Sequence, residues 1–129
     1  MNNILRECID KLQNIKSKMS DINSEDERSS GVNCANSLIR QSIDTRCSLI
    51  EDLYGDSEAG DEIHTNADYA LFCLEFTDSL YDIFKDHLNG AGDSMYDRGF
   101  KSQIRHFFEL FKPLQSWLQK TSIENIYNN

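Results

Sequence analysis

The chain has 129 residues, of which 39% are hydrophobic and 27% are charged, with a single proline and only six glycines. That size and balance predict one globular domain over residues 1–129 and exclude a disordered chain. The formal net charge of −9 disfavours direct binding to nucleic acid, because a phosphate-binding surface requires clustered lysine and arginine. Val32 is the only valine, which argues against an all-β fold, since strands are normally rich in β-branched residues.

The first predicted helix spans residues 3–22. Its apolar residues recur at intervals of three or four, the spacing that lines one face of a helix. They are Ile4, Cys8, Leu12, Ile15, Met19 and Ile22. This amphipathic pattern stands where a secretory signal would lie, and no run of about 18 apolar residues predicts a membrane span. We therefore expect a cytoplasmic protein whose four cysteines are reduced, with Cys8, Cys47 and Cys73 packing as small hydrophobic residues.

A polar segment, residues 23–31, separates the first helix from the second. Ser24 and Glu27 have the spacing of a capping box, which predicts an early start for the second helix. Gly31 favours a later start near Asn33 instead. The sequence leaves the two starts open.

The second and third helices are separated by a break. Apolar residues follow the helical period over residues 32–54, and the glycine-punctuated acidic segment 55–64 then interrupts it. Thr65 followed by Asp68 indicates the N-terminal cap of the third helix. The Asn-Gly pair at residues 89–90 indicates its end.

The fourth helix is predicted after a short loop at residues 90–94. Its inner face carries Phe100, Ile104, Phe107, Phe108, Phe111, Leu114 and Leu118. Pro113 lies inside this pattern and lacks a backbone N–H, so we expect the helix to be kinked or broken near Pro113. Four amphipathic segments joined by short loops predict an all-α, antiparallel four-helix bundle.

Acidic residues concentrate in one part of the chain. Between Cys47 and Phe84 there are ten acidic residues and no lysine or arginine, so this segment carries −10 and the remainder about +1. At about 100° per residue, five carboxylates fall within a sector of roughly 80° on the third helix, opposite its apolar residues. We call these five residues the acidic stripe: Asp68, Glu75, Asp78, Asp82 and Asp86. The preceding acidic segment adds Asp56, Glu58, Asp61 and Glu62.

The acidic stripe has two interpretations. It is either a solvated face that aids solubility, or a surface for a basic partner protein, where it would accelerate association and confer specificity. Like charges at i,i+4, such as Asp78 and Asp82, destabilise a helix by a few tenths of a kcal/mol, and a chain selected only for stability would intersperse lysines. We predict a protein-binding module, most simply an inhibitor or immunity-like factor that blocks a basic or nucleic-acid-binding surface.

Two alternatives remain open. Glu75 and Asp78 have the Glu-x-x-Asp spacing of metal-dependent helical hydrolases. No second pair matches, however, and the acidic stripe points away from the apolar face, so we expect no metal, cofactor or catalytic residue.

The other alternative is a structural or adaptor subunit. The fourth helix carries apolar residues on more than one side, and one-sided burial cannot use all of them. A homodimer or partner surface around Leu110, Leu114 and Trp117 fits this pattern. A central place for the helix in the bundle fits it equally well.

Overall fold

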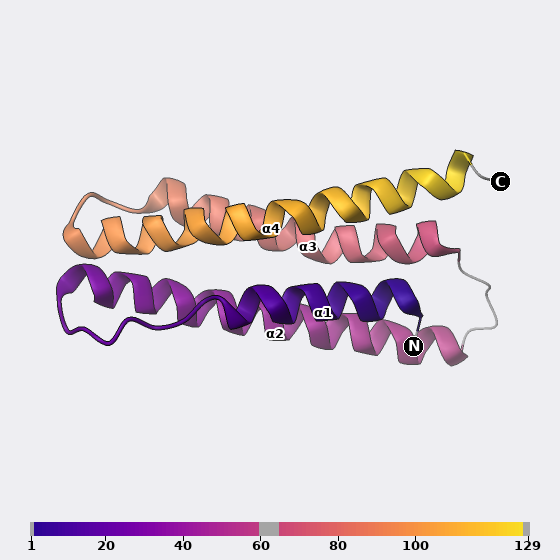
Figure 1. Cartoon of the computed structure of the whole chain (residues 1–129), viewed down its shortest axis with the longest axis horizontal. Coiled ribbons are helices and arrows are strands. Elements are labelled where there is room, and N and C mark those ends of the chain that lie inside the picture. Colours follow the sequence, from indigo (N-terminus) through magenta and orange to yellow (C-terminus); the bar gives the residue numbers. More distant parts are fainter. Residues whose placement is uncertain (1, 60–64, 128–129) are drawn as a thin grey trace.

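Four helices make up the described part of the chain: α1 (Asn3–Ser17), α2 (Glu27–Ala59), α3 (Asn66–Gly90) and α4 (Met95–Tyr127). The computed structural model describes residues 2–59 and 65–127, and the side chains of 2–52 and 65–123. Consecutive helices run in opposite directions, so that α2 is parallel to α4 (Figure 1). This arrangement confirms the predicted all-α, antiparallel four-helix bundle. Within the described residues, none of the helices combines the length and apolar character needed to cross a bilayer.

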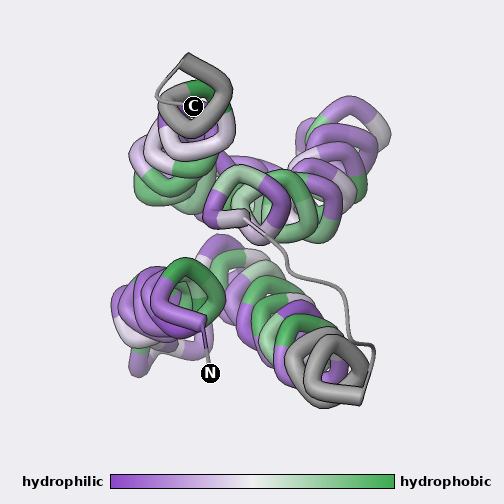
Figure 2. The backbone as a smooth tube through the Cα atoms, turned by 90° about the vertical axis from the view of Figure 1, so that its right-hand side faces the viewer, coloured by the Kyte–Doolittle hydropathy of each residue, from purple (hydrophilic) through white to green (hydrophobic). Residues whose placement is uncertain are grey.

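The core is formed by apolar residues of all four helices. The hydrophobic side of each helix faces the middle of the bundle, as the end-on view shows (Figure 2). Phe107 stacks on Phe111 with ring centroids 5.2 Å apart, and Phe84 of α3 meets Phe107 edge-on at 5.3 Å. Burying one such side chain contributes about 2–3 kcal/mol. The aromatic side chains therefore fix α3, the helix that carries the acidic stripe, against α4.

Helices α2 and α4 approach each other closely at two glycines. A Cβ atom on Gly31 would overlap the carbonyl oxygen of Tyr96, and a Cβ on Gly99 would overlap the carbonyl oxygen of Arg28. Neither position has room for a side chain, so the two backbones touch. Gly31 is therefore a packing residue within α2, and the later start near Asn33 that it suggested is wrong.

Helix α1 ends at Ser17, five residues before the predicted end at Ile22. Side chains of α2 hold the following segment in a non-helical path. The Asn33 side chain bonds both the backbone N–H and the C=O of Ile22, at 2.8 and 3.0 Å, and Asn36 Nδ2 donates to the Ser20 carbonyl at 2.9 Å. These bonds satisfy backbone groups that a longer helix would otherwise pair within itself.

Helix α2 begins early, at Glu27, but Asp26 and not Ser24 accepts the capping hydrogen bond. The Asp26 carboxylate accepts the backbone N–H of Ser29 at 2.7 Å, and the Ser24 hydroxyl donates to the same carboxylate at 2.8 Å. This bonding by Ser29 lowers the pKa of Asp26. Asp26 caps the helix because it directly precedes the first helical residue, Glu27, and lies three residues before Ser29.

The break predicted over residues 55–64 does not begin at Gly55, since α2 continues through Gly55 to Ala59. Residues 60–64 of the predicted break lie outside the described residues. One glycine in a helix interior costs about 1 kcal/mol relative to alanine. That cost is small beside the tertiary packing of a helix of 33 residues.

Helix α3 begins and ends as predicted. The Thr65 hydroxyl accepts the Asp68 backbone N–H at 3.2 Å, and the Asp68 carboxylate accepts the Thr65 N–H at 3.0 Å. This reciprocal pair is the predicted capping box. The helix ends at Gly90.

Helix α4 passes through Pro113 without a break. Past its midpoint the helix turns away from the other three (Figure 1). Pro113 is exposed, so the carbonyl of Glu109 that loses its helical N–H partner lies on the solvent side.

Candidate protein-binding surface

The acidic stripe lies on the outer side of α3. Glu75, Asp78, Asp82 and Asp86 are exposed, and Asp68 is half-buried. The buried residues of α3 occupy the opposite side: Ala67, Ala70, Cys73, Thr77, Leu80 and Phe84. The structure therefore brings the five carboxylates together on one face, directed away from the core.

Two carboxylates of the acidic stripe have structural partners. Asp68 takes part in the capping box at the start of α3, and Asp78 accepts a hydrogen bond of 3.1 Å from Nε2 of Gln115 on α4. Within the described part of the chain, Glu75, Asp82 and Asp86 accept no hydrogen bond and form no ion pair. These three negative charges are available to a ligand.

Among the described residues, no basic side chain forms an ion pair within 4.0 Å with an exposed carboxylate of the acidic stripe. The ion pairs that join described residues within 4.0 Å lie elsewhere: Lys11 with Glu7, Lys16 with Asp44, Arg40 with Asp21, and Arg98 with Asp93. Four of the five carboxylates, from Glu75 to Asp86, take part in none of these pairs. Their summed field therefore extends into solvent, attenuated by salt over about 10 Å at 0.1 M ionic strength.

Leu71 is an apolar residue on the same face that the sequence analysis missed. Its side chain is 52% exposed, and it lies three residues after Asp68 and four before Glu75, the spacing of neighbours on one helix face. A single exposed leucine is ordinary. This one, however, has carboxylates on both sides, so it adds an apolar contact to a charged surface. The same spacing rule, applied to apolar residues outside the inner series, would have identified it.

The predicted acidic extension before α3 is only partly within the described structure. Asp56 and Glu58 belong to the last turns of α2, where the backbone alone is described. Asp61 and Glu62 lie outside the described residues. The surface described here is accordingly that of α3 alone.

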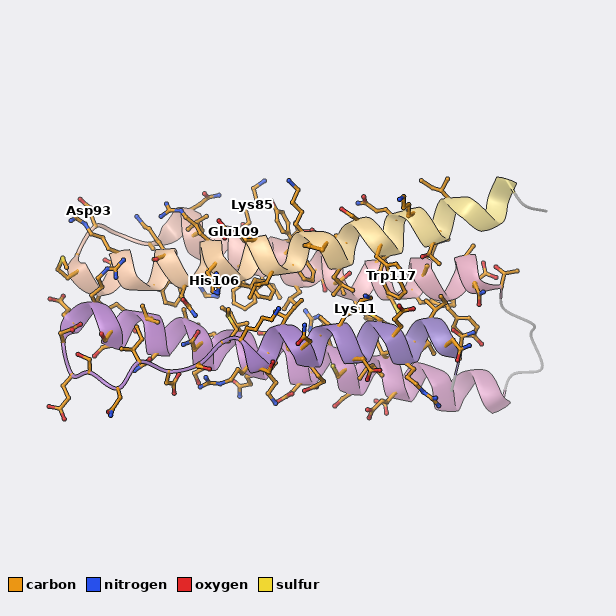
Figure 3. All side chains as sticks on the ribbon, viewed as in Figure 1. Lys11, Lys85, Asp93, His106, Glu109 and Trp117 are labelled. Carbon is orange, nitrogen blue, oxygen red and sulfur yellow. The ribbon has the colours of Figure 1, made fainter. Side chains whose placement is uncertain are left out.

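The residues of the predicted oligomer surface on α4 lie partly in the core and partly at its edge. Leu114 is only 3% exposed and belongs to the core, whereas Leu110 and Trp117 are half-buried and pack against it. The Lys11 ammonium lies 5.1 Å from the Trp117 ring centroid, in the space between α1 and α4 (Figure 3). The bundle itself therefore uses much of the apolar surface on which this prediction was based.

Three cysteines pack as small hydrophobic residues, as predicted. Cys8, Cys47 and Cys73 are buried and unbridged, one on each of the first three helices. Hydrogen bonding to Cys73, together with burial, raises the pKa of the Cys8 thiol. Across the described residues, no three His, Cys, Asp or Glu side chains are grouped so as to hold a metal ion.

Comparisons of the chain with protein-family models, with curated proteins and with solved structures found no match.

Proposed function

We propose that this protein is a non-catalytic, cytoplasmic binding module that presents its acidic stripe to a basic surface of a partner protein. The observation that carries the proposal is the exposure of four carboxylates on one helix face, none of which has an ion-pair partner among the described residues. The most concrete form is a small inhibitor or immunity-like factor. Its partner would be an enzyme with a basic, nucleic-acid-binding groove, in which the carboxylates occupy places otherwise taken by phosphates.

Electrostatics supports this kind of partner. A row of like charges on one face steers an oppositely charged protein toward it and raises the association rate, with a strong dependence on salt. The same charges repel nucleic acid, so the partner would be a protein that binds nucleic acid and not the nucleic acid itself. Leu71 would add an apolar contact at the end of the row nearest the start of α3.

The test compares two triple variants that lose the same charge. The first neutralises the acidic stripe with Glu75→Gln, Asp78→Asn and Asp82→Asn. These changes keep the side-chain shapes, and the amide introduced by Asp78→Asn retains an oxygen that can accept the Gln115 hydrogen bond. The control neutralises three exposed carboxylates elsewhere with Asp10→Asn, Glu25→Gln and Glu109→Gln.

Each protein is used to capture partners from extract of its native host at low and moderate salt. The proposal predicts that the wild type and the control capture the same basic protein and that the stripe variant loses it while remaining folded. Equal capture by all three proteins would refute the proposal.

The alternatives predict other outcomes for the same stripe variant. A metal-dependent hydrolase would show an increase in melting temperature with a divalent cation, and the stripe variant would lose that increase. An adaptor that binds through α4 would lose its partner with Trp117→Ala and keep it with the stripe variant.

A further inference from the structure

A pocket opens where the end of α3 meets the start of α4. It has a volume of about 380 Å³, and its side-chain lining consists of Asp86, His87, Tyr96, Asp97 and Phe100. The backbone of the α3–α4 connection at Gly90 and Ala91 completes the lining. The pocket thus combines two carboxylates with three aromatic rings.

The aromatic lining is held in place by the fold. The rings of His87 and Phe100 meet edge-to-face with centroids 6.0 Å apart, and Phe84 lies behind His87 at 6.2 Å. Hydrogen bonding to Cys34 of α2 raises the pKa of Tyr96. The ring contacts place His87 and Phe100 side by side in the absence of a ligand, which reduces the ordering that binding would require.

The two carboxylates are placed differently. Asp97 is oriented by the start of α4, where its Oδ2 accepts the Ser94 hydroxyl at 2.8 Å while the Asp97 N–H donates to the Ser94 hydroxyl oxygen at 3.1 Å. Asp86, across the pocket on α3, accepts no hydrogen bond and forms no ion pair within the described part of the chain. One carboxylate is therefore fixed and the other is free to accept.

This composition selects one class of ligand. The two carboxylates repel anions. A metal ion is disfavoured because no three ligating side chains are grouped at any place among the described residues. A guanidinium group suits both parts of the lining, because it stacks on aromatic rings and donates two parallel hydrogen bonds to a carboxylate. An ammonium group cannot form the planar, two-point contact.

We propose that this pocket accepts an arginine side chain of the partner protein. The inference rests on the proposed function, since Asp86 is both the last residue of the acidic stripe and part of the pocket lining. Asp86 lies eleven positions after Glu75, which is roughly 16 Å along a helix at 1.5 Å per residue. A basic segment of the partner that lies along the outer face of α3 would reach the pocket with one arginine.

The test uses a small probe and needs no partner. N-acetyl-arginine amide is titrated into isotopically labelled protein, and N-acetyl-citrulline amide serves as a neutral probe of the same shape. Backbone NMR shifts should saturate around His87, Tyr96 and Phe100 with the arginine probe alone. Asp86→Asn should weaken binding about tenfold, because a charge-assisted hydrogen bond is lost, and the remote variant Asp10→Asn should leave it unchanged.

A second variant tests the ring contact. Phe100→Leu keeps an apolar side chain and should weaken the arginine probe about threefold to fivefold through loss of stacking. A melting curve establishes that this variant is folded. The inference is overturned if citrulline binds as well as arginine, if no saturable shift appears at the pocket, or if Asp86→Asn leaves the affinity unchanged.

This inference and the proposed function can fail separately. If the stripe variant loses the captured partner but Asp86→Asn retains it fully, the proposed function stands and the arginine pocket is wrong. If neither variant affects capture, the proposed function is wrong. The arginine probe then decides whether the pocket binds a guanidinium group at all.

Discussion

At the scale of single residues, the acidic stripe contains carboxylates with a structural role and carboxylates without one. Asp68 completes a capping box, and Asp78 bonds Gln115 on the neighbouring helix. Asp82 has no such partner within the described residues and lies four residues from both Asp78 and Asp86, so it repels two like charges. The stripe therefore contains charge that disfavours the folded helix, which is the pattern expected where binding, and not stability, determines a residue.

This difference predicts opposite effects of two substitutions on the free energy of unfolding. Asp82→Asn should leave stability unchanged or raise it by a few tenths of a kcal/mol, since it removes repulsion. Asp68→Ala should lower stability by about 0.3–1 kcal/mol, because it removes the carboxylate half of the capping box and a negative charge from the helix N-terminus, while the Thr65 cap remains. Urea unfolding at low salt measures both. A loss of more than about 1 kcal/mol in Asp82→Asn would contradict this account of the stripe.

The lowered pKa of Asp26 makes the stability of the fold depend on pH in the acid range. The Ser29 backbone N–H, with the Ser24 hydroxyl, lowers the pKa of Asp26 in the folded chain. Because the pKa of Asp26 is lower in the folded than in the unfolded chain, its ionised carboxylate stabilises the fold at pH values above the unfolded-state pKa of about 3.9. That stabilisation is lost as the pH falls through the pKa of the folded state. Asp26→Asn should therefore show a smaller loss of stability between pH 5 and pH 2 than the wild type.

The variant also provides its own control. Asparagine caps helices nearly as well as aspartate, so Asp26→Asn should resemble the wild type at pH 7. Thermal melting at pH 7, 5 and 3 distinguishes the two effects. Parallel loss of stability in both proteins at low pH would show that Asp26 makes no contribution.

At the scale of helices, the contact between α2 and α4 depends on two glycines. A side chain at Gly31 or Gly99 would collide with the backbone of the other helix. The intrinsic gain of about 1 kcal/mol for replacing glycine by alanine in a helix is then reversed by overpacking, which typically costs about 1–3 kcal/mol. Gly31→Ala and Gly99→Ala should each lower the free energy of unfolding.

Gly90 supplies the matched control for this prediction. A Cβ at Gly90, the last residue of α3, meets no atom within 4 Å. Gly90→Ala should therefore be neutral or slightly stabilising. Chemical unfolding of the three variants compares them directly, and equal effects at all three glycines would contradict the close approach of α2 and α4.

Local signals predicted some of these helices and distant contacts determined the rest. The start of α3 was predictable because Thr65 and Asp68, which form its cap, are three residues apart. The end of α1 was not, because the side chains that hold the next segment come from Asn33 and Asn36, more than ten residues further along. Gly31 gave a misleading local signal, since its role is a contact with α4.

The candidate surface was predictable to a similar degree. Helical periodicity placed the acidic stripe opposite the apolar residues of α3, and the observed burial agrees with that placement. Leu71 was missed because it interrupts the polar face and belongs to no core series. The pocket at Asp86 and Phe100 could not be inferred, because it depends on how two helix ends meet.

At the scale of the whole molecule, charge is distributed unevenly along the chain. The segment between Cys47 and Phe84 has a net charge of −10, whereas the rest of the chain has a net charge of about +1. The exposed carboxylates of α3 all lie on one face of that helix. A distribution of this kind produces a directional field, which acts mainly on the rate of association with an oppositely charged partner.

The most direct test is the association rate of the captured partner with wild-type protein and with the stripe variant, measured across a range of salt concentrations. The wild-type rate should be high at low salt and fall steeply as salt is added. The stripe variant should associate more slowly at low salt and approach the wild-type rate at high salt. Equal rates at every salt concentration would contradict the claim that the acidic stripe is the binding surface.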